Sequence, residues 1–332
     1  MANSEVVVVT GATSGSGRAI VRRFAQDGAS IGLIARGRDG LEAARREVEQ
    51  AGGRALVVPT DVADWDGVSS AASAVEEAFG PIDIWINNAM TTVFAPLKEI
   101  EPDEYRRATE VTYLGTVWGT KAALDRMLPR DRGSIVIVGS ALAYRGIPLQ
   151  APYCGAKHGV KGMFESLRTE LRHDNSNVHL SMVQLPGLNT PQFLHCRSKM
   201  PKVPQPMPPY YAPEVAADAV HWAAHNRRRE LYVGAPTLKT IVGNKVAPWL
   251  VERVLAKQGY SGQQSDMPAD PDRKDNLMSP PPGDPGAHGP YDAQSRRSSI
   301  QTQLAEHRGL IAAAAGTVLM LTGSLVVGNR FG

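Results

Sequence analysis

The sequence predicts an α/β fold in which a doubly wound parallel sheet of about seven strands carries helices on both faces and is followed by a C-terminal extension. Short apolar runs rich in β-branched residues alternate with longer helical stretches up to about residue 235. These runs are continuously apolar, as in strands that are covered on both faces. A glycine-rich loop joins the first run to the first helical stretch. With 332 residues and 42% hydrophobic residues, the chain can form a substantial core.

Each apolar run is predicted as one strand, and stretches such as 40–51 and 65–79 as the helices between them. Residues 200–213 contain too much proline for a helix or a central strand, so we expect a loop over the fold. In chain order the predicted strands are EVVVVT, SIGLIAR, RALVVP, IDIWIN, GSIVIVGS, VHLSMVQLP and ELYVG.

Composition excludes several classes of function. Two cysteines, Cys154 and Cys196, do not make a disulfide framework and suit a reducing compartment. The net charge of +3 is spread along the chain, so we expect no nucleic-acid partner. His221 and His225 have the spacing of helical metal ligands, but Trp222 stands where a zinc hydrolase has glutamate, so no metal site is predicted. No basic segment precedes residues 6–9, so we expect this part to fold in the cytoplasm.

The loop TGATSGSG after the first strand is predicted to bind a pyrophosphate. Glycine lets the backbone turn sharply and approach the phosphates, whose charge is stabilised by amides at the N-terminus of the next helix. A position between a strand and a helix distinguishes this loop from an ordinary glycine-rich turn. The cofactor-binding residues predicted here are Gly11, Thr13, Ser14, Gly15, Ser16 and Gly17.

The end of the second strand indicates which dinucleotide binds. An acidic residue at this point binds the ribose 2′-hydroxyl of NAD, whereas an arginine accommodates the 2′-phosphate of NADP. The chain has Arg36 and Arg38 here, and no acidic residue until Asp39. We therefore predict that NADP is preferred over NAD.

Tyr153 precedes Lys157 by four residues, so a helix places both on one face. Further motifs occur at the ends of later strands: Asp61 with Val62, NNAM at 87–90, Ser140, and PGLNT at 186–190. In this order and spacing the chain resembles the short-chain dehydrogenase/reductase family over roughly residues 4–235. The resemblance implies a Rossmann-type sheet and an oxidoreductase.

The resemblance also implies the role of each catalytic residue. Tyr153 would exchange a proton with the substrate oxygen, and Ser140 would donate a hydrogen bond to that oxygen. A free phenol titrates near 10, so favouring its phenolate near neutral pH requires roughly 3 pKa units, or about 4 kcal/mol. Lys157 would supply positive charge for this and would bind the nicotinamide ribose. Further cofactor contacts are implied for Asp61, Val62, Asn88, Ala89, Tyr153, Lys157, Pro186, Gly187 and Thr190.

Two residues depart from the family pattern. Met90 replaces the glycine of the family's NNAG motif. Thr112 stands where the family usually has an asparagine that is associated with a proton-relay water and a helix distortion, and we count it as the fourth catalytic residue. Its hydroxyl could hold a water or bond back to its own helix.

The C-terminal part divides into three predicted segments. An amphipathic helical extension covers 236–260, with a helix over 239–257 that either packs on the fold or lies at a membrane surface. A linker rich in proline, glycine and serine covers 261–305. Residues 309–328 carry no charge and are predicted as a transmembrane helix of about 30 Å. The arginines lie mostly before this segment, so we expect that flank, and with it residues 1–235, to lie in the cytoplasm. The alternative for 309–328 is a soluble, alanine-rich helix that packs on a partner, in which case the protein would be soluble and cytoplasmic.

These observations favour a membrane-anchored NADP-dependent oxidoreductase that interconverts an alcohol and a carbonyl of an apolar small molecule. One alternative is an NADP-binding sensor or scaffold with little turnover, which Thr112 and Met90 motivate. Another is dehydration or epimerisation on the same fold. The resemblance further implies a homodimer or homotetramer formed through the helix that carries Tyr153 and the helix before it.

Overall fold

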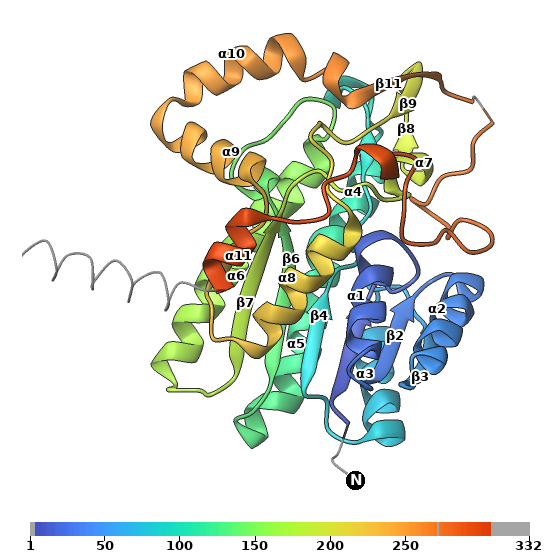
Figure 1. The fold of residues 1–332 in the computed structure, drawn as a ribbon, viewed down its shortest axis with the longest axis vertical. Coiled ribbons are helices and arrows are strands. Elements are labelled where there is room, and N and C mark those ends of the chain that lie inside the picture. Colours follow the sequence, from blue (N-terminus) through green and yellow to red (C-terminus); the bar gives the residue numbers. More distant parts are fainter. Residues whose placement is uncertain (1–3, 271, 307–332) are drawn as a thin grey trace, which may run out of the picture.

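The computed structural model describes residues 4–270 and 272–306. Its centre is a sheet of seven parallel strands in the order β10-β7-β6-β4-β1-β2-β3 (Figure 1). The order reverses beside β1, which is the arrangement of a Rossmann-type sheet. The predicted fold class is therefore confirmed.

The strands of this sheet match the predicted apolar runs. They are β1 Val6–Thr10, β2 Ser30–Ala35, β3 Arg54–Pro59, β4 Ile84–Asn87, β6 Ser134–Ser140, β7 His179–Leu185 and β10 Glu230–Tyr232. Two small pairs lie outside it, β5 Val93–Phe94 with β8 Arg197–Ser198 and β9 Lys202–Pro204 with β11 Gln264–Pro268. The α-helices are α1 Gly15–Ala25, α2 Arg38–Gln50, α3 Trp65–Phe79, α4 Pro102–Thr109, α5 Gly115–Met127, α6 Ala151–His173, α7 Gln192–His195, α8 Pro213–His225, α9 Ala235–Val246, α10 Pro248–Gln258 and α11 Ile300–Glu306. Short 3-10 turns occupy Leu97–Glu99, Leu128–Arg130, Ala141–Ala143, Ser261–Gln263 and Asp292–Gln294, and a π-helical turn, η2, occupies Glu110–Leu114.

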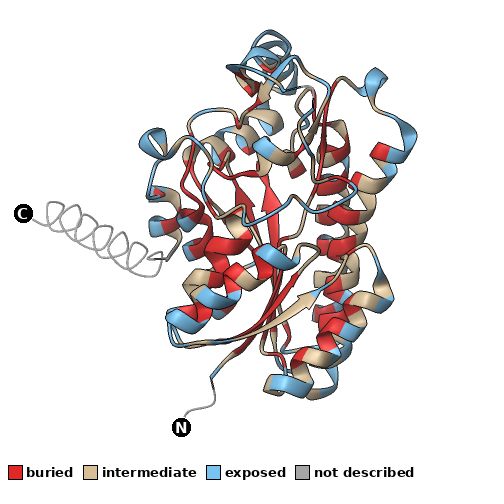
Figure 2. Cartoon of the chain, turned by 90° about the vertical axis from the view of Figure 1, so that its right-hand side faces the viewer, coloured by how far each residue is buried: buried red, intermediate tan, exposed pale blue. Residues whose placement is uncertain are grey.

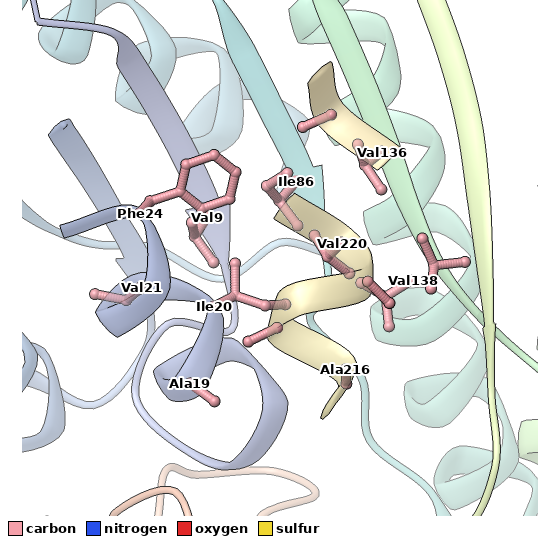
Figure 3. Packing of buried hydrophobic residues seen from close by; sticks show 14 of the residues in the cluster. Val9, Ala19, Ile20, Val21, Phe24, Ile86, Val136, Val138, Ala216 and Val220 are labelled. Carbon is pink, nitrogen blue, oxygen red and sulfur yellow. The ribbon is translucent and has the colours of Figure 1, made fainter. Parts of the chain in front are cut away.

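Helices bury both faces of the sheet, which explains why its strands are continuously apolar. One face packs against α1, α2 and α8, and the other against α3, α5 and α6. Figure 3 shows the first layer, where Ile20 of α1 and Val220 of α8 lie over Ile86 of β4. In Figure 2 the central strands are accordingly buried along their length.

The extension after residue 235 contains two helices, so the single helix predicted over 239–257 is wrong. α9 ends at Val246 and α10 begins at Pro248. Proline lacks the amide hydrogen that a continuous helix needs and clashes with the preceding turn, so it begins the second helix instead.

The two helices pack on the fold with one side only. Thr237 and Ile241 are buried. The outer side exposes cations together with large apolar side chains. The exposed residues of these kinds are Leu238, Lys239, Val242, Lys245, Val246, Trp249, Leu250, Arg253, Val254 and Lys257.

The segment predicted as a linker lies against the fold for much of its length. β11 pairs with β9, and Leu277 and Ala287 are buried. We call residues 274–292 the strap, and Figure 1 shows it within the orange and red trace that runs from β11 to α11. The strap is held mostly by hydrogen bonds to distant parts of the chain, a kind of contact that composition does not predict.

The predicted transmembrane segment 309–328 lies outside the described residues. Within the described ranges, no helix is both long enough and apolar enough to cross a bilayer.

Candidate active site

A cavity of about 440 Å³ opens at the carboxyl ends of the central strands. This is where open parallel sheets bind their ligands. Most of the residues singled out in the sequence meet on its wall. They are Gly11, Thr13, Ser14, Gly15, Ser16, Arg36, Asp61, Val62, Asn88, Ala89, Met90, Ser140, Tyr153, Lys157, Pro186, Gly187 and Thr190.

The glycine loop forms one wall of the cavity. Gly11 and Gly15 have φ angles of 68° and 56°, in the left-handed region that favours glycine. Gly17 does not line the cavity; a Cβ there would lie 2.0 Å from the Gly11 carbonyl oxygen, so this glycine serves close packing of the loop. The loop leads directly into α1, whose N-terminus can bind a phosphate group.

Ser140, Tyr153 and Lys157 form the opposite wall. Ser140 ends β6, and the other two residues lie in the first turns of α6. The Ser140 Oγ accepts a hydrogen bond from the Leu142 amide at 3.1 Å, and Ser140 lines the same cavity as Tyr153. The Lys157 Nζ donates to the Val138 carbonyl at 2.7 Å and lies 5.6 Å from the centroid of the Tyr153 ring. Serine, tyrosine and lysine therefore converge within one enclosed space.

Burial dominates the ionisation of both titratable groups. It raises the pKa of Tyr153 to about 12, and the Ser140 side chain opposes this rise only in part. Burial also lowers the pKa of Lys157 to about 8. The expected lowering of the Tyr153 pKa by Lys157 is not found in the protein alone, because removing water disfavours the phenolate. Tyr153 is thus protonated at neutral pH and can donate its proton.

Thr112 does not lie on the cavity wall. It sits in η2, so the helix distortion is present although the family's asparagine is not. Its hydroxyl donates to the Thr91 carbonyl at 2.7 Å and accepts from the Thr91 amide at 3.0 Å. The residue therefore ties the helix to the loop after β4, instead of bonding to its own helix.

Replacing Thr112 with valine is expected to lower the free energy of unfolding by about 1–3 kcal/mol, because a buried Thr91 amide and carbonyl lose their partner. Thr109→Val is the matched control, since the Thr109 hydroxyl donates to the Tyr105 carbonyl in its own helix at 2.9 Å. Urea denaturation measures both. Equal losses in the two variants would contradict this structural role of Thr112.

The two arginines predicted to bind the 2′-phosphate differ in position. Arg36 lines the cavity beside Asp61. The side chain of Arg38 is 70% exposed, does not line the cavity and pairs with Glu42 at 3.9 Å. Only Arg36 is therefore placed to contact a ligand in this cavity.

Sequence reasoning missed the part of the cavity that lies over Tyr153. Its walls come from α7, from residues 206–208 in the loop after β9 and from the α9–α10 pair. Only the proline-rich loop gave a signal, because it was predicted to lie over the fold. The additional lining residues include Gln150, Phe193, Met207, Thr240, Val251 and Leu255.

Comparison with known proteins agrees with this geometry. The family model described as short chain dehydrogenase matches residues 5–200. This chain therefore belongs to the short-chain dehydrogenase/reductase family of oxidoreductases.

Several relatives are similar over different lengths. An uncharacterized oxidoreductase of Bacillus subtilis, YxnA, is 30% identical over 269 residues, covering 80% of this chain and 76% of that one. Human dehydrogenase/reductase SDR family member 7 is 39% identical over 170 residues, which is 50% of each chain. The 3-dehydrosphinganine reductase of Danio rerio is 33% identical over 196 residues, covering 58% of each chain.

Two solved structures have a similar fold. An alcohol dehydrogenase from the archaeon Thermococcus sibiricus, complexed with 5-hydroxy-NADP, has a TM-score of 0.61 and 27% identity, covering 69% of this chain and 96% of that one. A metagenomic short-chain oxidoreductase in complex with NADP has a TM-score of 0.58 and 28% identity, covering 70% and 97%.

Proposed function

We propose that the protein is an NADP-dependent oxidoreductase that interconverts an alcohol and a carbonyl. The observation that carries this proposal is the convergence of Ser140, Tyr153 and Lys157 on the cavity that the glycine loop also lines. The same cavity is lined by Arg36, by the glycine loop and by Thr190, the positions at which a dinucleotide would be contacted. NADPH would supply the hydride.

The roles of the side chains follow from their positions. For reduction, the neutral Tyr153 phenol donates its proton to the substrate oxygen. Ser140 holds that oxygen beside the phenol by a hydrogen bond. Lys157 binds the cofactor ribose from its buried position. In the direction of oxidation Tyr153 takes the proton back.

NADP is proposed as the preferred cofactor because Arg36 lies on the cavity wall at the position that reads the ribose 2′-substituent. The complexes of the two similar structures with NADP and 5-hydroxy-NADP support this assignment. The remaining contacts are proposed for the lining residues of the glycine loop and of the loops after β3, β4 and β7.

An apolar substrate is proposed because apolar side chains surround the space over Tyr153. Phe193, Met207, Val251 and Leu255 line it from three different segments, and Met90 lines it from the loop after β4. Such a lining stabilises a hydrocarbon or aromatic group of the substrate, while a few polar side chains orient the substrate.

The test is turnover of full-length protein with NADPH and a panel of apolar aldehydes and ketones, and with NADP and the matching alcohols. Consumption of NADPH with an equal amount of alcohol formed is expected. Tight NADPH binding without turnover of any compound would favour a sensor or scaffold. Product formed without net change in NADPH would favour dehydration or epimerisation.

The proposal also includes attachment to a membrane through residues 309–328 and assembly as a homodimer or homotetramer through α5 and α6. The uncharged sequence of 309–328 and the exposed apolar and cationic side of α9 and α10 support the attachment. Membrane fractionation of the full chain beside a chain ending at residue 308 tests the first part. Light scattering in detergent tests the second, and a monomer would overturn it.

A further inference from the structure

The strap contacts the wall of the cavity at three separate places. The first is the end that would hold the adenosine. Arg36 donates to the carbonyls of Met278 at 2.9 Å, of Leu277 at 3.2 Å and of Asn276. The Asn276 side chain accepts from the Thr91 hydroxyl at 3.1 Å. The strap therefore fixes the arginine that is proposed to read the 2′-phosphate.

The second place is the glycine loop. The Gly15 amide donates to the Gly286 carbonyl at 3.0 Å. Arg18, which is only 1% exposed, forms an ion pair with Asp284 at 3.0 Å. A buried arginine that is held this way gives the strap a fixed position over the start of α1.

The third place is the loop after β7, at the end that would hold the nicotinamide. The Asn189 side chain donates to Asp292 at 2.7 Å and accepts from the Tyr291 amide at 3.0 Å. Gly289 donates to the Asn189 carbonyl at 3.2 Å. Asn189 is fully buried. The three places together show that one continuous segment, the strap, contacts the loops that line both ends and the middle of the cavity.

The cavity persists beneath this segment, because Asn276, Pro280 and Pro281 line it together with Arg36 and Asp61. Arg36 uses three of its five N–H groups on strap carbonyls, which leaves two for a phosphate. We propose that the strap forms the outer wall of the cofactor site, positions Arg36, and must detach before NADPH can leave. This inference rests on the proposed function, because it takes NADPH as the ligand.

A reversible cross-link tests the proposal directly. A Cβ built on Gly37 lies 3.2 Å from the Cβ of Pro280 in the strap, a few tenths of an ångström from the usual separation in disulfides. Gly37 has a φ angle of −83°, which cysteine adopts readily. Both native cysteines, Cys154 and Cys196, are buried and unpaired. In the double variant Gly37→Cys/Pro280→Cys, the oxidised form, in which the new disulfide joins the strap to Gly37→Cys, can therefore be compared with the reduced form of the same protein.

Full-length protein loaded with NADPH is mixed with excess NADP, and release is followed by the loss of NADPH fluorescence. Oxidised protein is expected to release NADPH at least about tenfold more slowly than reduced protein, a change of about 1.4 kcal/mol in the barrier. Equal rates overturn the proposal. If the protein is cross-linked first and then cannot bind added NADPH, the result supports the proposal. If cross-linking instead expels NADPH that is already bound, the strap competes with the cofactor and the proposal is overturned.

The opposite change comes from loosening the strap. Asp284→Asn removes the ion pair with Arg18, and release is expected to accelerate several-fold, with a weaker preference for NADPH over NADH. Asp272→Asn is the control, because this exposed carboxylate forms no ion pair within the described ranges. Equal release rates in the two variants count against the proposal. If the wild-type protein binds neither NADPH nor NADH, the proposed function itself fails.

Discussion

Replacing Tyr153 with phenylalanine is expected to lower kcat for carbonyl reduction by about 10²- to 10⁴-fold. The variant loses the buried phenol that is proposed to neutralise the developing alkoxide with its proton, and phenylalanine fills nearly the same volume. The dissociation constant of NADPH is expected to change by no more than about twofold, since the ring still packs beside Lys157. Steady-state kinetics with a compound from the carbonyl panel, together with fluorescence titration of NADPH, separates the two effects.

Tyr144→Phe is the matched control for this experiment. The Tyr144 hydroxyl bonds to Glu230 at 2.5 Å and does not line the cavity. Its loss is expected to alter stability and to leave kcat within a few-fold of the wild type. A Tyr153→Phe enzyme that retains full activity would contradict the assignment of the proton donor. Similar losses in both variants would instead indicate a general effect on the fold.

Replacing Arg36 with glutamine is expected to weaken NADPH binding by about 10- to 100-fold. A hydrogen bond to a charged group contributes about 1.5–3 kcal/mol, and the 2′-phosphate would lose the guanidinium that neutralises it. NADH lacks this phosphate, so its affinity reports only the loss of the contacts between Arg36 and the strap. Fluorescence titration of both cofactors therefore isolates the effect of the phosphate.

Arg38→Gln controls for the general loss of one positive charge. Its side chain is exposed and lies off the cavity wall, so NADPH affinity is expected to change by no more than about twofold. A large loss with Arg38→Gln and a small one with Arg36→Gln would reverse the assignment of the two arginines. Wild-type protein that binds NADH as tightly as NADPH would remove the basis for a preference.

Local sequence patterns were sufficient for the sheet and for much of the candidate site. The apolar run of β1 correctly predicted a strand, since a strand covered by helices on both faces needs apolar side chains on both, and all residues of β1 are buried. Strand ends carry the ligand-facing residues in this class of sheet, so Ser140 and Asp61 could be located from the sequence. The α9–α10 break also had a local signal in Pro248, which the apolar periodicity of the segment obscured.

Other features depend on contacts between distant residues and could not be predicted this way. Arg36 and Arg38 are equivalent in the sequence, but the path of the chain after β2 turns one into the cavity and the other toward Glu42. The position of Thr112 depends on Thr91, which lies 21 residues earlier. The strap is rich in proline, glycine and polar residues, and its few apolar side chains follow no periodicity. Nothing in its composition therefore indicates that Asp284 meets Arg18.

The pairing of Arg18 with Asp284 joins residues that are 266 positions apart, which has a consequence for the order of folding. Contacts at such separations form late, because closing a long loop costs chain entropy before the contact stabilises it. During synthesis the sheet and the glycine loop can form while the strap is still inside the ribosome, since domains fold as units from the N-terminus. At that stage the strap does not yet cover the cavity. Under the proposed function, a newly made chain would be able to load its cofactor before its own C-terminal part closes over the site.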